Sequence, residues 1–245
     1  MSPLSSSDAL DLQSARGCTV VVTGRRPGGT AMRQVLPDLW ETQEDNPFPG
    51  LRTHAYLWTG TNNVLFYSVA GEADFDELGR LGGITDQYLS HQDEAGPMLG
   101  KIAERFGPRL HAAAAEADVV GRHARIDVPL TECHVDDNGV EIVPTPGHTV
   151  GSTCYLVPGA DGTRYLFTGD TLYRGASGTW RAGYIEGMSD ARVLADSLRL
   201  LAKTEPDVVV SSAFAGEAGV HRIDAREWPA HVDQALSGLS AAVQG

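Results

Sequence analysis

Residues Thr145–Ser152, TPGHTVGS, form the most specific pattern in the sequence. They follow a strand expected over Val140–Val143, and their proline and glycine predict a tight turn at the end of that strand. Such a turn presents the imidazole of His148 at its tip. His148 is therefore the first candidate site residue.

A second pattern, Leu166–Leu172, reads LFTGDTL and places Asp170 at the end of an apolar strand expected over Arg164–Thr168. A carboxylate beside a buried strand is costly without a cation or hydrogen-bond donors nearby. We therefore expect Asp170 to have a partner. The alternative is that its carboxylate caps the backbone amides of the two residues that follow.

Together these segments closely resemble the glyoxalase-II-like members of the metallo-β-lactamase-fold superfamily, which carry a TPGHTxGS turn and an FxGDxL strand end in this order. The resemblance extends roughly from Val35 to Val210. It implies an α+β fold, a four-layer αββα sandwich with two facing sheets and helices outside. It also implies that His148 binds a metal and that Asp170 bridges two metals.

The family's main motif, HxHxDH, corresponds here to the stretch LSHQDE that begins at Leu89. His91 and Asp93 match the motif. Leu89 stands in place of the first histidine and Glu94 in place of the last. The loop therefore keeps only part of the family's ligand set.

The family's last ligand is a histidine after the final strand, expected near Ser212 or Ala213, and the sequence has no histidine there. His221 lies a few residues further on, and a shifted loop could bring it into the site. First-row metals are held by three or four protein ligands, and each missing ligand removes much of the affinity. The sequence therefore predicts one metal ion instead of two.

The predicted metal ligands are His91, His148, Asp170, Asp93 and Glu94. Zinc is the expected ion, with iron or manganese as alternatives and a metal-free state as a further one. Asp93 and Glu94 are also the candidate catalytic residues: Asp93 as a base or orienting group, Glu94 as an oxygen ligand or as a general acid or base. Such a site would hydrolyse an ester, thioester, lactone or amide.

A rival hypothesis is a fold relative that has lost metal hydrolysis and acts as a binding protein or a metal-free enzyme. Leu89 and the missing final histidine favour the rival, whereas the intact turn and strand end favour the metal-dependent hydrolase. The loop Arg174–Trp180 follows the Asp170 strand and has two interpretations as well. It either contacts an anionic or aromatic substrate, or packs on its own domain with Trp180 as its anchor.

The length, charge and composition of the chain indicate its domain organisation, partners and location. The 245 residues predict a flexible tail over residues 1–16 and a single domain over residues 17–245. A net charge of -13 disfavours nucleic acid as a partner, no stretch is apolar enough for a membrane helix, and no GxGxxG motif indicates a nucleotide cofactor. With three scattered cysteines and no signal peptide, we expect a cytoplasmic protein acting on a small molecule, of unknown oligomeric state.

Hydrophobic periodicity predicts the main elements around these motifs. Two apolar strands, Thr53–Trp58 and Asn63–Val69, form a hairpin, and Asp207–Val210 is the final buried strand before an irregular loop. Another strand is expected over Cys18–Thr23 and a short one over Ile84–Ser90. Helices are expected over Phe75–Leu81, Pro97–Phe106, Asp190–Ala202 and Trp228–Val243.

Overall fold

The computed structural model describes residues 32–244 of the chain. The tail expected over residues 1–16 and the strand expected over Cys18–Thr23 lie outside the described residues and stay predictions.

The first sheet has seven strands in the order β1-β2-β5-β6-β7-β8-β9. Its centre is the predicted hairpin, in which β5 and β6 pair antiparallel with Thr59 opposite Asn63. From β6 onward the pairs are parallel, so the chain crosses over through a helix or loop between strands. The strands are β1 (Arg33–Leu36), β2 (Leu39–Glu41), β5 (Tyr56–Thr59), β6 (Asn63–Phe66), β7 (Asp86–Tyr88), β8 (Arg109–Ala113) and β9 (Val128–Leu130).

The second sheet has six strands in the order β10-β11-β12-β13-β16-β18. The sequence predicted an irregular loop after the buried strand Asp207–Val210, but β18 forms there and pairs antiparallel with β16, which covers an edge that would otherwise be open. This three-residue strand is too short and too polar to stand out in the sequence. The strands are β10 (His134–Val135), β11 (Glu141–Pro144), β12 (Thr153–Pro158), β13 (Arg164–Gly169), β16 (Val208–Ser211) and β18 (Val220–Arg222).

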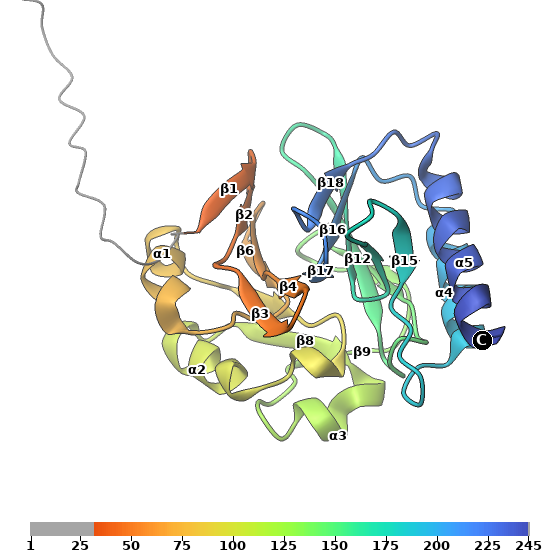
Figure 1. The fold of residues 1–245 in the computed structure, drawn as a ribbon. Helices are drawn as coiled ribbons and strands as arrows, with labels where there is room; N and C mark the ends of the chain where they lie inside the picture. The colour runs from red at the N-terminus through yellow and green to blue at the C-terminus, as the bar shows by residue number, and fades with distance from the viewer. Residues whose placement is uncertain (1–31, 245) are drawn as a thin grey trace, which may run out of the picture.

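Helices cover the outer faces of both sheets, which confirms the predicted four-layer αββα arrangement (Figure 1). On the side of the first sheet lie α1 (Phe75–Arg80), α2 (Pro97–Phe106) and α3 (Ala117–Val120). On the side of the second lie α4 (Ala191–Leu201) and α5 (Trp228–Gln244). Helix α4 is capped by Asp190, whose carboxylate accepts hydrogen bonds from the backbone amides of residues 192 and 193, each at 3.0 Å.

Two small sheets complete the fold near the ends of the central strands. One pairs β4 (Leu51–Thr53) with both β3 (Asp45–Phe48) and β17 (Ala213–Phe214), which links the two halves of the chain. The other pairs β14 (Leu172–Arg174) with β15 (Trp180–Ala182).

Aromatic side chains from both sheets form the main core between them. Phe66 of β6 stacks on Phe167 of β13 with ring centroids 3.9 Å apart. A separate core lies between the second sheet and its helices, where the buried indole of Trp228 donates a hydrogen bond to the carbonyl of Leu201 at 2.8 Å. Burial of large aromatic surfaces is the main stabilising term for such sandwiches.

Tyr67 ties the two sheets together at the end where the candidate residues lie. Its hydroxyl donates to the carbonyl of Val210 at 2.8 Å and accepts from the backbone amide of Gly169 at 3.0 Å. The β13–β16 ladder is irregular between Phe167 and Gly169, so this hydroxyl pairs groups that the ladder leaves free. The backbone of Tyr67 has φ of 72°, which is strained for a non-glycine residue.

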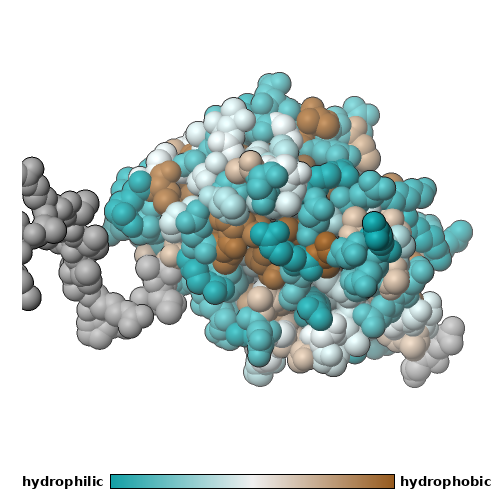
Figure 2. Space-filling view, turned by 90° about the horizontal axis from the view of Figure 1, so that it is seen from above, coloured by the Kyte–Doolittle hydropathy of each residue, from teal (hydrophilic) through white to brown (hydrophobic). Residues whose placement is uncertain are grey.

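The view from above shows mostly hydrophilic side chains with a small apolar area in the middle (Figure 2). Among the described helices, none combines the length and the apolar character needed to cross a bilayer.

Candidate metal centre

His91 lies in the loop that follows β7. The 3₁₀ turn η2 (Gln92–Glu94) forms next in the chain, and the imidazole of His91 is only 4% exposed. The loop is held against the second sheet, because the amide of Thr153 donates to the carbonyl of Ser90 at 2.8 Å. His91 therefore belongs to the first sheet but faces the second.

His148 is presented by the TPGHTVGS turn as predicted. Gly147 has φ of 129°, and a Cβ there would come within 2.3 Å of the backbone nitrogen of Leu194, so the turn needs glycine. The Nδ1–H of His148 donates to the carbonyl of Gly183 at 2.7 Å. Because a carbonyl only accepts, the Nε2 atom is left as an acceptor.

Asp170 follows β13 directly. Gly169 has φ of 53°, and a Cβ on it would come within 2.1 Å of Ser90 Oγ, so this close approach of the two sheets also requires glycine. The hydroxyl of Ser212 donates to Oδ1 of Asp170. The other oxygen, Oδ2, points toward the two histidines.

The side chains of His91, His148 and Asp170 lie close together. His91 Nε2 lies 3.7 Å from Asp170 Oδ2, and His148 Nε2 lies 3.9 Å from the same oxygen. One ligand atom from each residue falls within 4.8 Å of the others. Ligands of a tetrahedral zinc ion are about 3.3–3.5 Å apart, so a small contraction would bring all three to bonding distance.

The buried Nε2 of His148 supports this interpretation. It has no hydrogen-bond partner among the residues that the structure describes. An unpaired nitrogen lone pair in the interior is costly, and a bound cation would satisfy it. The donor set of two imidazoles and one carboxylate therefore fits one divalent ion.

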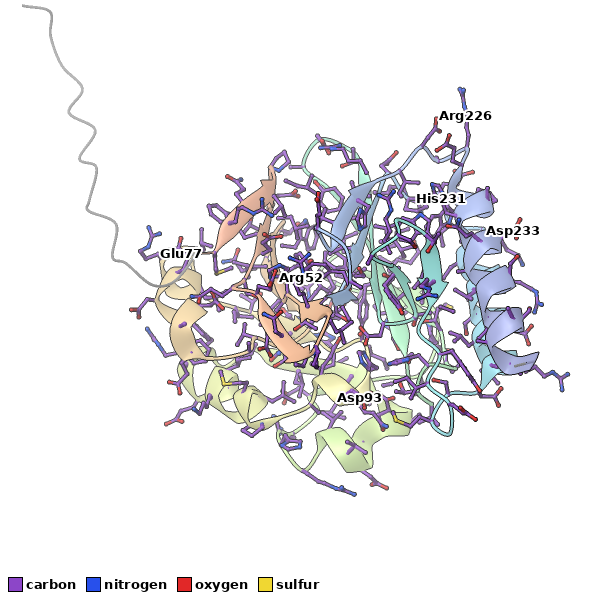
Figure 3. All side chains as sticks on the ribbon, viewed as in Figure 1. Arg52, Glu77, Asp93, Arg226, His231 and Asp233 are labelled. Atoms are coloured by element: carbon purple, nitrogen blue, oxygen red, sulfur yellow. The ribbon has the colours of Figure 1, made fainter. Side chains whose placement is uncertain are left out.

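Asp93 lies at the open side of this group. Its Oδ2 is 4.0 Å from His148 Nε2, and the side chain is 43% exposed. The carboxylate is thus within reach of the same ion and also of solvent and substrate. Figure 3 shows Asp93 in the loop near the lower part of the junction between the two halves of the molecule.

Glu94 occupies a different place, on the far side of His91. Its Oε2 accepts from the amide of Ser90 at 2.7 Å and its Oε1 accepts from the Ser90 hydroxyl at 2.5 Å. The same hydroxyl lies 2.7 Å from His91 Nδ1, and Glu94 Oε1 is 3.3 Å from that nitrogen. Glu94 and Ser90 together orient His91 so that Nε2 faces Asp170.

The electrostatics of the two histidines differ sharply. Burial alone would lower the pKa of His91, but the carboxylates of Glu94, Asp170 and Asp93 outweigh it and raise the pKa to about 10. Burial, together with the charge on His91, lowers the pKa of His148. In the absence of a metal, the negative charges of the site thus hold a proton on His91, the position that a cation would take.

Besides Glu94, the two other replaced family positions also have structural roles instead of ligand roles. Leu89 is 2% exposed and belongs to an apolar cluster with Leu99, Leu110, Ala112 and Val120. Ser212 stands where the last histidine was expected and hydrogen-bonds Asp170. Neither side chain offers a good ligand for a second ion.

His221 does not join the group. It lies on β18, with its ring edge-on to Trp180 at 5.5 Å between centroids, and lines a separate pocket with Arg174. Burial and the charge of Arg174 lower its pKa to about 4. Trp180 itself is buried against Trp228, so the Arg174–Trp180 loop packs on its own domain through this anchor.

Sequence reasoning missed three supporting groups. Ser90 stands at an unspecified position of the loop motif, and the Gly183 carbonyl carries no side-chain signal. Buried Glu116 was missed as well: it accepts from the hydroxyl of Thr149 and from the amide of Gly151 at 3.1 Å and so fixes the histidine turn. Only its acidic character beside α3 could have drawn attention to it.

The comparisons with known proteins identify the family to which this fold belongs. The family model of the metallo-beta-lactamase superfamily matches residues 78–213. The chain therefore belongs to the metallo-beta-lactamase superfamily.

Individual relatives are more distant. A hydroxyacylglutathione hydrolase from Rhodobacter capsulatus is 28% identical over 182 residues, covering 70% of this chain and 66% of that protein. The hydroxyacylglutathione hydrolase from Shewanella oneidensis is 29% identical over 123 residues, covering 49% of this chain and 42% of that protein. The chain spans about half the length or less of several curated relatives that it matches.

Among solved structures, a motif mutant of a metallo-beta-lactamase from Cronobacter sakazakii superposes with a TM-score of 0.67 at 16% identity. The match covers 88% of this chain and 97% of that one. At this identity the likeness concerns the fold alone.

The orientation of His91 by Glu94 can be tested with Glu94→Gln. Loss of the carboxylate charge next to Nδ1 should weaken zinc binding by about 10–100-fold while zinc still binds at one ion per chain. Zinc titration against a competing chromophoric chelator measures the affinity. Glu104→Gln, on the exposed side of α2, is the matched control. An unchanged zinc affinity would contradict the orienting role of Glu94. A loss of zinc affinity as large as that in Asp170→Asn would contradict it as well.

The lowered pKa of His221 predicts a pH dependence of stability. The unfolded chain takes up a proton at this residue below about pH 6.5, whereas the folded protein does so only near pH 4. Stability is therefore lost as the pH falls through this window, by roughly 1–2 kcal/mol after allowance for partial exposure. His221→Gln should lose less stability than the wild type between pH 7 and pH 4.5 in urea denaturation, whereas His134→Gln, at an exposed site, should not differ from it. Equal losses in the wild type and His221→Gln would refute the assignment.

Proposed function

We propose that this protein is a hydrolase that uses one divalent metal ion, with zinc as the expected ion, to cleave an ester, thioester, lactone or amide. The observation that carries the proposal is the convergence of His91, His148 and Asp170, with the Nε2 atom of His148 buried and unpaired among the described residues. Membership of the metallo-beta-lactamase superfamily and the hydroxyacylglutathione hydrolases among the relatives support the reaction class.

We assign the roles of the side chains as follows. His91, His148 and Asp170 are the ligands, and an ion held there would activate water and polarise a carbonyl group. The Gly183 carbonyl keeps Nε2 of His148 available, and Ser212 fixes one oxygen of Asp170 so that the other faces the ion.

Asp93 is assigned as the general base or orienting carboxylate. It is the exposed acidic group nearest to the open side of the site, 4.0 Å from His148 Nε2, so it can accept a proton from an attacking water or add an oxygen to the ligand set. Glu94 is assigned an orienting role, because both of its oxygens are engaged by Ser90.

A metal-free function remains the second candidate. The chain of hydrogen bonds from His91 through Ser90 to Glu94 is complete without an ion, which favours this alternative. It does not account for the unpaired Nε2 of His148.

Metal analysis combined with two variants tests the proposal. Protein purified without chelator should contain about one equivalent of zinc, iron or manganese and should hydrolyse a 4-nitrophenyl ester or a simple thioester. His148→Ala and Asp170→Ala each leave two of three ligands, so both should lose the metal and at least about 100-fold in kcat/KM. His134→Ala, an exposed histidine on β10, should change neither. Clearly substoichiometric metal, or full activity in both ligand variants, would refute the proposal.

A further inference from the structure

A cleft of about 460 Å³ opens beside the candidate metal centre, and it has an unusual balance of charge. Four carboxylates line it: Asp45, Asp93, Glu94 and Asp170. No lysine or arginine lines it among residues 32–244. Even with a divalent ion bound, the carboxylates outnumber its two positive charges, so the cleft keeps a negative potential.

The arginine in the lining strand β4 does not relieve this imbalance. Arg52 lies between the cleft residues Leu51 and Thr53, but its side chain pairs with Glu44 at 3.1 Å. Its guanidinium also lies 4.9 Å from the ring centroid of Phe214. The cation is thus already engaged and is not among the lining groups.

Most of the other lining groups are apolar. They come from β4, from the segment after β6, from the start of α2, from the loop after β15 and from β17, and include Leu51, Val69, Pro97, Met98, Ile185 and Ala213. Ile185 is 42% exposed at the rim, where an apolar ligand would cover it. An apolar wall next to a hydrolytic centre is suited to an acyl chain.

We infer that this cleft binds substrates with an uncharged, apolar acyl group and discriminates against substrates that carry a carboxylate. The inference rests on the proposed hydrolase function and specifies its substrate class. A carboxylate bound along the apolar wall would lose its hydration, would meet no lysine or arginine among the lining residues, and would face carboxylates of the protein. An alkyl chain would instead cover the exposed apolar rim and would lose no hydration of a charged group.

A pair of esters that differ only in charge tests the inference. The monoanionic 4-nitrophenyl ester of adipic acid and its uncharged methyl ester share the same leaving group and nearly the same length. With the metal-loaded protein at pH 8 and low ionic strength, kcat/KM should be at least about tenfold higher for the methyl ester. Added salt should narrow the difference, because it screens the repulsion.

Two lysine variants locate the effect. Ile185→Lys places an ammonium group at the cleft rim and should narrow the preference for the methyl ester about fivefold or more. Met188→Lys adds the same charge in the same loop at a side chain that is 54% exposed and does not line the cleft, so it should leave the preference nearly unchanged. Both positions are exposed, so folding should tolerate both changes.

The outcomes separate this inference from the proposed function. Equal turnover of the two esters, or preference for the anion, would overturn the inference alone. An equal shift in both lysine variants would also overturn it, because overall charge and not the cleft would then set the preference. Failure to hydrolyse either ester with the metal bound would reject the proposed function and the inference with it.

Discussion

The contact between Gly169 and Ser90 is the constraint on which the site depends. The two candidate ligands His91 and Asp170 come from different sheets, and they meet only because the backbone after β13 comes close to the loop after β7. Any side chain at Gly169 would collide with the hydroxyl of Ser90. Hydrogen bonds between Thr153 and Ser90 and between Ser212 and Gly169 hold the same junction from both sides.

Hydrogen bonds around this junction also orient the three candidate ligands. Each candidate ligand has one atom in a hydrogen bond within the protein and another atom that faces the candidate metal site. Nδ1 of His148 donates to the Gly183 carbonyl, and Oδ1 of Asp170 accepts from the Ser212 hydroxyl. His91 has the same arrangement through Ser90 and Glu94. Such pre-orientation lowers the cost of binding an ion, because little rotamer freedom is left to lose.

The substitutions at the family's other ligand positions are consistent with one ion. At position 89 an apolar side chain completes a small core, and at position 94 a carboxylate turns back toward the loop. Under the proposed function, the residues at the family's second metal position serve packing and the orientation of His91. The cleft beside the candidate site is lined by four carboxylates.

Much of the fold and part of the site could be predicted from the sequence. The turn around His148 and the strand end at Asp170 are local patterns, and they led to the four-layer fold and to two candidate ligands that lie close together in the structure. The contacts of Glu94 could not be predicted from the sequence, because they depend on which of several nearby hydrogen-bond donors its carboxylate reaches. Strand β17 was missed because its partner β4 is distant in sequence, and β18 was missed because it is short and polar. The location of His221 depends on the pairing of β18 with β16.

Zinc-edge anomalous diffraction from crystals loaded with excess zinc tests directly whether the protein binds one metal ion at this site. We expect one strong peak per chain, within bonding distance of Nε2 of His91, Nε2 of His148 and Oδ2 of Asp170. Two peaks of similar height beside these residues, or a single peak bound elsewhere, would contradict it.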